Sequence, residues 1–179
     1  MNAYQVLDLE ERLDVSDEAL AVAFREAGKR LHPDAGGGEG DFSGLQQARE
    51  ILASPSKRLR HWMELRGIVL DPRGAVSAGL MDFFAEIGAA TQAAEAVIRK
   101  REAARSALAK ALLENEIQMA REAVEALQGR IGVRISEACG GFAELEQTPD
   151  GEAAARLARD LAFLEKWRAA LRAMFSRLV

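Results

Sequence analysis

Residues 17–34, DEALAVAFREAGKRLHPD, decide how the N-terminal part of this chain folds. Their apolar side chains fall at intervals of four, three and four, which places them on one face of a helix: Leu20, Phe24, Ala27 and Leu31. Arg25 and Lys29 lie one turn apart on another face. Proline disfavours helical dihedral angles at the residue before it, so the helix must end at His32-Pro33. The stretch therefore predicts an amphipathic helix with a basic exposed side.

The sequence on either side of this helix predicts further short elements. A first short helix is expected within residues 3–9. Residues 34–41 contain four glycines, which leave the backbone too much entropy for a regular element, and they predict a mobile loop. Apolar periodicity then predicts a second long helix from about Phe42 to Ala53, and a shorter basic helix follows over 56–65. Two helices joined by such a loop can pack antiparallel.

The chain after Val76 is rich in alanine and other helix-forming residues. We expect breaks around 113–116 and at Gly140-Gly141, with a firm one at 148–151, where Pro149 and Gly151 interrupt the pattern. The last helix, over about 152–178, repeats apolar residues every three or four positions. These patterns predict an all-α protein whose C-terminal part is an antiparallel three-helix bundle.

Composition and charge exclude several classes of protein. The chain has 179 residues, a formal net charge of -4, one cysteine and two histidines. Without excess positive charge, nucleic acid is not expected as a partner. No run approaches the ~20 apolar residues of a membrane-spanning helix, so no membrane partner is expected. The first residues carry acidic side chains where a signal peptide would be basic and then apolar, which predicts a cytoplasmic protein.

Catalytic and metal-binding patterns are missing from the sequence. His32 and His61 are separated by the glycine-rich stretch and a helix, and Cys139 is the lone cysteine, so no zinc site of ordinary spacing is present. The glycines of residues 36–40 follow a helix and lack the downstream Lys-Ser/Thr of a phosphate-binding loop. We therefore expect no metal, no cofactor and no enzymatic activity.

One tripeptide and its surroundings suggest a function. Tyr4 to Leu9, the helix over 17–31, His32-Pro33-Asp34, a flexible loop, Phe42 at the next helix, and Ser54 to Arg58 occur in an order that resembles a J-domain. The resemblance covers residues 2 to about 65 and predicts a J-domain over 1–66. It implies a co-chaperone that displays the tripeptide at the tip of a helical hairpin and stimulates ATP hydrolysis by a DnaK-family chaperone. The residues expected to bind that chaperone are His32, Pro33, Asp34, Arg25 and Lys29.

Physical chemistry suits these residues to that role. A proline-stiffened loop can present an imidazole and a carboxylate at a fixed point, while Arg25 and Lys29 meet an acidic partner surface. The sequence departs from the family at Ala35, where many J-domains carry Lys, and at Glu26, where a basic residue is common. These departures leave fewer positive charges on the basic surface, so we expect weaker or more selective binding to the chaperone.

The rest of the chain narrows the resemblance. Residues 161–168, LAFLEKWR, and 79–83, GLMDF, resemble the last and first bundle helices of HscB-type co-chaperones of iron–sulfur cluster assembly. We expect a linker over 67–76 and an HscB-like client-binding bundle over 77–179. By resemblance, an exposed apolar patch would hold the iron–sulfur scaffold protein, and its residues are Leu80, Met81, Phe84 and Phe163.

Other interpretations of these residues stay open. Apolar side chains on helical stripes are often core, and core packing and partner contact are equally compatible with each of the four. Ala85 and Gly88 replace expected acidic residues, and the bundle segment between Met81 and Phe163 is longer than is usual in the family. A second hypothesis keeps the J-domain but gives the bundle another client or a role in self-association, which burial of all four would favour. A third is a structural helical protein whose tripeptide merely ends a helix.

Overall fold

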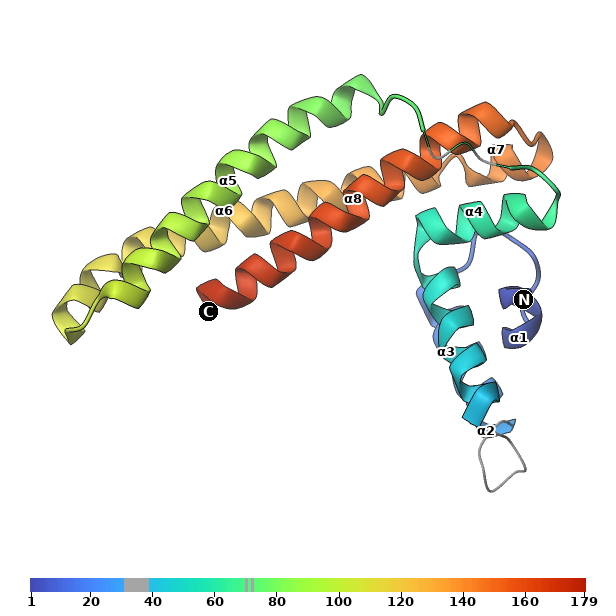
Figure 1. Ribbon diagram of the computed structural model, residues 1–179, viewed down its shortest axis with the longest axis horizontal. Coiled ribbons are helices and arrows are strands. Elements are labelled where there is room, and N and C mark those ends of the chain that lie inside the picture. The colour runs from blue at the N-terminus through green and yellow to red at the C-terminus, as the bar shows by residue number, and fades with distance from the viewer. Residues whose placement is uncertain (31–38, 70, 72) are drawn as a thin grey trace. The chain divides into compact units, whose positions relative to one another are not determined.

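The computed structural model describes residues 1–30, 39–69, 71 and 73–179, with only the backbone described at 39–41. Every regular element of these residues is a helix, which confirms the all-α prediction. Figure 1 shows the helices in chain order, and their bounds are α1 Ala3–Leu7, α2 Asp17–Arg30, α3 Glu39–Ala53, α4 Pro55–Leu65, α5 Ala78–Ala103, α6 Ala107–Cys139, α7 Phe142–Gln147 and α8 Gly151–Leu178.

The chain divides into two compact units that do not follow residue order. The first joins Met1–Gly74 to Ala138–Ala162, and the second joins Ala75–Glu137 to Phe163–Val179. Helix α8 therefore contributes residues to both units. The expected boundaries at 66 and 77 remain a prediction.

In the first unit, α2 and α3 form an antiparallel hairpin. The Arg49 guanidinium lies 4.8 Å from the centroid of the Phe24 ring, and a Cβ on Gly28 would lie 3.9 Å from a methyl carbon of Leu45. Residue numbers thus rise along one helix as they fall along the other. Helix α3 begins at Glu39 rather than at Phe42, so the predicted loop is wrong for residues 39–41. Helical hydrogen bonding outweighs the entropy cost of the one glycine there.

Helix α4 connects this hairpin to the start of the chain. It begins at Pro55, whose ring suits the first helical position. The preceding Ser54 caps the helix, since its Oγ accepts the N–H of Lys57 at 3.3 Å. The buried Arg58 donates from Nη1 to the carbonyls of Leu52, at 2.8 Å, and Val15, at 3.1 Å. The buried core of the hairpin, α1 and α4 comprises Tyr4, Leu7, Leu13, Leu20, Leu45, Leu52, Leu59, Trp62 and Met63.

In the second unit, α5 and α6 are antiparallel, as are α6 and α8. Between the first pair, Glu86 is bonded to Arg130, and Glu116 to Lys100 at 2.6 Å. Between the second pair, Gln128 Nε2 donates to the Leu171 carbonyl at 3.2 Å, and Arg121 Nε donates to the Leu178 carbonyl at 2.8 Å. The predicted three-helix bundle is confirmed.

One predicted break within the bundle is wrong. Residues 113–116 lie inside the continuous helix α6, and the break occurs instead at 104–106. Ser106 Oγ accepts the N–H of Ala109 at 3.1 Å, so this serine begins α6. The polar residues Glu114, Asn115 and Glu116 sit on the helix surface and do not interrupt it. Breaks at Gly140-Gly141 and at 148–150 are confirmed, the latter with Asp150 Oδ1 accepting the N–H of Glu152 at 2.9 Å.

No helix among the described residues has the length and apolar character needed to span a membrane.

Candidate functional site

The exposed side of α2 carries the two cations expected to meet a partner. Arg25 and Lys29 are both exposed, and we call this pair the basic face of α2. Buried Leu20 and Ala27 hold the opposite side of the helix against the hairpin core. The basic face therefore projects from a helix whose orientation is fixed by packing.

Glu26 modifies the charge of this face. Its Oε1 accepts from Lys29 Nζ at 2.7 Å, one helical turn away. That hydrogen bond, together with the charge of Lys29, lowers the pKa of the Glu26 carboxyl. The ion pair with Glu26 thus partly neutralises the positive charge of Lys29. This agrees with the reduced basic surface expected from the sequence.

The tripeptide His32-Pro33-Asp34 lies outside the described residues. Helix α2 is described up to Arg30, whose Nη1 donates to Asp8 Oδ2 at 3.3 Å. In the sequence, the tripeptide begins two residues after Arg30.

A second candidate surface lies on α5 and α8 within the second unit. Met81 and Phe84 of α5 are 60% and 59% exposed, and Phe163 of α8 is 42% exposed. The Trp167 ring joins the two helices, since its centroid lies 6.2 Å from that of Phe84 and 5.8 Å from that of Phe163. These side chains form one apolar surface, which we call the aromatic patch and define as Met81, Phe84, Phe163 and Trp167.

Leu80 does not belong to this surface. Its side chain is only 4% exposed, so the expectation that it would be exposed with the other three is wrong. It lies on the same side of α5 as the buried residues Phe83 and Ile87, three and seven positions further on. Leu80 thus supports the helix from which Met81 and Phe84 project.

Trp167 was not among the residues expected in a binding site. Its place among the regularly spaced apolar residues of the last helix indicated core packing alone, yet it is half-buried and contacts the two exposed phenylalanines. The sequence did contain one indication that Trp167 belongs to the same surface as Phe163: the two residues are four positions apart, and such residues share a helix face. Large amphipathic rings at the centre of an exposed apolar surface are typical of protein interfaces.

Within the described part of the chain, no three His, Cys, Asp or Glu side chains gather in a way that could hold a metal ion. His61 is instead used inside the fold, where its Nε2 accepts the backbone N–H of Ala3 at 3.0 Å.

Comparisons with known proteins relate part of the chain to J-domain proteins. No protein-family model matches. A stretch of 61 residues is 36% identical to the curved DNA-binding protein of Pseudomonas syringae pv. tomato, covering 32% of this chain and 19% of that protein. Over 58 residues, the chain is 38% identical to the tetratricopeptide repeat and J domain-containing co-chaperone DNJ1 of Cryptococcus neoformans var. grubii, covering 32% of this chain and 11% of that protein. The chain thus matches less than a fifth of either relative.

A comparison of structures covers the whole chain. The chaperone HscB from Vibrio cholerae superimposes with a TM-score of 0.55 and 22% sequence identity, over 100% of both chains. A sequence identity of 22% supports a shared fold but does not show a shared activity. Together with the local sequence matches, it establishes that this chain has an HscB-like fold throughout and includes a segment related to a J-domain protein.

Proposed function

We propose that this protein is a co-chaperone, not itself an enzyme, that stimulates ATP hydrolysis by a DnaK-family chaperone. The observation that carries the proposal is the HscB-like fold of the whole chain, in which an exposed Arg25 and Lys29 precede His32-Pro33-Asp34. The 38% identity to a J domain-containing co-chaperone supports it over 58 residues.

The chemistry of the contact follows from these residues. The cations of the basic face would orient an acidic surface of the chaperone, and the Asp34 carboxylate would pair with an arginine there. Exposed ion pairs contribute little net affinity, because solvent screens them, and act mainly on the rate and geometry of encounter. Fast and weak binding suits a protein that must leave after each round of hydrolysis.

Steady-state ATP hydrolysis tests this role directly. The DnaK-family ATPases of the same cell are assayed alone, with the wild-type protein, and with Asp34→Asn. We expect stimulation by the wild type that Asp34→Asn abolishes. The matched control is Asp14→Asn, the same chemical change at another exposed aspartate, which should stimulate as the wild type does. Equal rates with and without the protein, for every ATPase, would contradict the proposal.

We further infer that the aromatic patch holds the client, and that this client is an iron–sulfur cluster scaffold protein. The likeness of the fold to HscB and the exposure of Met81, Phe84 and Phe163 support this role. A surface with aromatic anchors at its centre can supply most of the binding energy of a protein contact. The alternative is a different client at the same patch.

Binding of a purified scaffold protein, measured by calorimetry, distinguishes these clients. Truncation of a central aromatic anchor typically costs ~2 kcal/mol or more, so Phe84→Ala should weaken binding about thirtyfold or more. Val69→Ala, at another exposed apolar residue, is the control and should bind normally. Stimulation of the ATPase without client should be unchanged in Phe84→Ala. A wild type that stimulates the ATPase but does not bind the scaffold would point to another client.

A further inference from the structure

Helix α6 carries apolar side chains on two separate faces. One face is buried against the bundle and comprises Ile117, Ala120, Val124, Leu127, Ile131 and Ile135. On the other, every large apolar side chain is at least 58% exposed: Leu108, Leu112, Met119 and Val133. A helix that is apolar on two sides is normally covered on both.

The exposed residues follow a strict pattern. They lie on a single row whose members alternate at intervals of four and three, and we call it the outer row: Leu108, Leu112, Asn115, Met119, Glu122, Ala126, Gly129 and Val133. This spacing is the seven-residue repeat of helices that pack against a partner helix. All the exposed large apolar residues of α6 fall on the row, as expected for a contact surface and not for scattered exposure.

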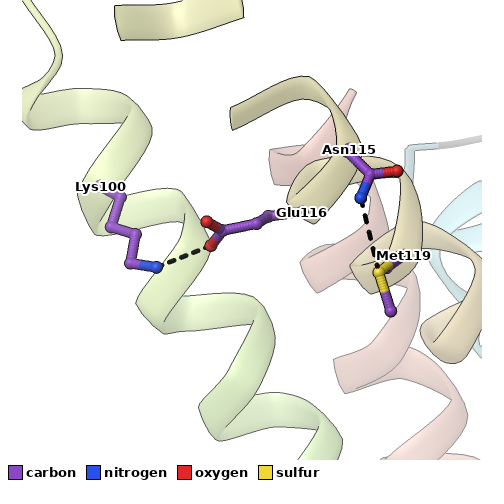
Figure 2. Close-up of polar contacts among 4 residues, drawn as sticks. All are labelled: Lys100, Asn115, Glu116 and Met119. Atoms are coloured by element: carbon purple, nitrogen blue, oxygen red, sulfur yellow. Dashed lines mark hydrogen bonds and ion pairs between the residues drawn. The ribbon is translucent and has the colours of Figure 1, made fainter. Parts of the chain in front are cut away.

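Beyond the end of α8 the bundle consists of two helices only. Helix α8 ends where its Leu178 carbonyl accepts from Arg101 of α5, at 3.3 Å, and from Arg121 of α6. The hairpin of α5 and α6 continues beyond that point, and over residues 102–120 it buries only Ile117 and Ala120. Lys100 and Glu116 join its two helices at 2.6 Å. Figure 2 shows Asn115 and Met119 on another side of α6 from Glu116.

We propose that the outer row is an interface between two copies of this chain, with their α6 helices antiparallel. A two-fold axis between Met119 and Glu122 places Leu112 and Asn115 of each row against the small residues Gly129 and Ala126 of the other. Leu108 then faces Val133 of the second copy, and Leu112 faces Gly129. A Cβ on Gly129 would meet no atom within 4 Å, so space is open there for a leucine side chain.

Charge favours a second copy in this orientation. Arg105 precedes the outer row and Glu137 follows it. The antiparallel arrangement brings each arginine near the glutamate of the other copy, so opposite charges meet at both ends. A parallel arrangement would place Glu122 against Glu122 and each end against a like charge. The row is therefore complementary to itself only when reversed.

The size of the row sets the strength of this contact. From Leu108 to Val133 it runs ~38 Å, and a strip ~10 Å wide covers about 400 Å² per copy. Stable interfaces bury about 800 Å² per partner, so we expect a reversible dimer that forms at high concentration. This inference does not rest on the proposed co-chaperone role, because its partner is the chain itself.

Sedimentation equilibrium of the full chain over two decades of concentration tests the interface. The mean mass of the wild type should rise towards twice the monomer mass, and that of Leu112→Lys should stay monomeric throughout. Val69→Lys adds the same charge at an exposed residue off α6 and should behave as the wild type. Circular dichroism checks that each variant is folded. A monomeric wild type, or a Leu112→Lys variant that still associates, would overturn the proposal.

Disulfide trapping tests the orientation. In a Cys139→Ala background, chains carrying Asn115→Cys are mixed with chains carrying Ala126→Cys under mild oxidation. The antiparallel row brings these two positions together, so the mixture should form a disulfide-linked dimer faster than either chain alone. If either variant links to itself as fast as the mixture does, the proposed arrangement is wrong.

Discussion

The protonation state of His61 affects the stability of the N-terminal helices. Its Nε2 must be unprotonated to accept the N–H of Ala3, and its ring stacks on Tyr4 with centroids 5.9 Å apart. Burial lowers the pKa of His61 below its ordinary 6.5, and the nearby Glu64 and Glu11 oppose this shift only in part. The unfolded chain therefore binds this proton more readily than the folded chain does.

The sign of the pH dependence follows from that difference. Where the unfolded state holds more protons, stability rises with pH, so the contribution of His61 is complete above about 6.5 and is lost as pH falls below it. We expect the free energy of unfolding in urea to decrease between pH 7.5 and 5.5, with a slope of up to about 1.4 kcal/mol per pH unit.

Two histidine variants attribute this slope to one residue. His61→Gln keeps an acceptor but does not titrate, so its stability should vary little over the same window. His32→Gln changes the other histidine of the chain and should retain the wild-type slope. An unchanged slope in His61→Gln would show that other groups cause the pH dependence.

At the scale of elements, the basic face of α2 predicts a salt-dependent interaction with the chaperone. If Arg25 and Lys29 meet an acidic surface, Lys29→Glu should slow association several-fold at low ionic strength, measured by stopped-flow fluorescence. The difference from the wild type should shrink as added salt shortens the range of the charges. Lys57→Glu, at an exposed lysine of α4, is the matched control. Equal slowing by both variants would mean that net charge alone acts.

The predictability of each helix depended on the signals at its ends. Ser54-Pro55 marked the end of α3 and Asp150-Gly151 the start of α8, and each lies within one or two residues of the observed boundary. The end of α2 predicted at His32-Pro33 lies outside the described residues. At residues 113–116 polarity was mistaken for a break, although neither glycine nor proline is present. The capping Ser106 was the stronger signal, because its side chain satisfies a free N–H of α6.

The aromatic patch shows what periodicity alone could not decide. Leu80 and Met81 are adjacent and equally apolar, but successive residues of a helix point about 100° apart, so one is buried and the other is exposed. Which one faces outward depends on how α5 is rotated against α6 and α8, and no local pattern encodes that rotation. The role of Trp167 likewise depends on Phe84, which lies on another helix.

At the scale of the whole chain, the N-terminal helices depend on residues far along the sequence. The N–H of Leu13 donates to Glu146 of α7, and the Arg58 guanidinium lies 5.9 Å from the centroid of the Phe142 ring. The first unit accordingly includes residues 138–162. Contacts over such sequence separations leave no periodic signal, so they could not be predicted from the sequence.

Removal of the Phe142 ring should therefore weaken helices that lie more than 70 residues earlier in the chain. Phe142 is buried, and truncation of a buried phenylalanine to alanine costs about 3 kcal/mol or more. Native-state hydrogen exchange should show α4 amides losing protection by a comparable free energy in Phe142→Ala. Phe163→Ala makes the same change at an exposed ring of the second unit and should leave α4 protected. Unchanged α4 protection in Phe142→Ala would mean that residues 1–74 are stable without α7.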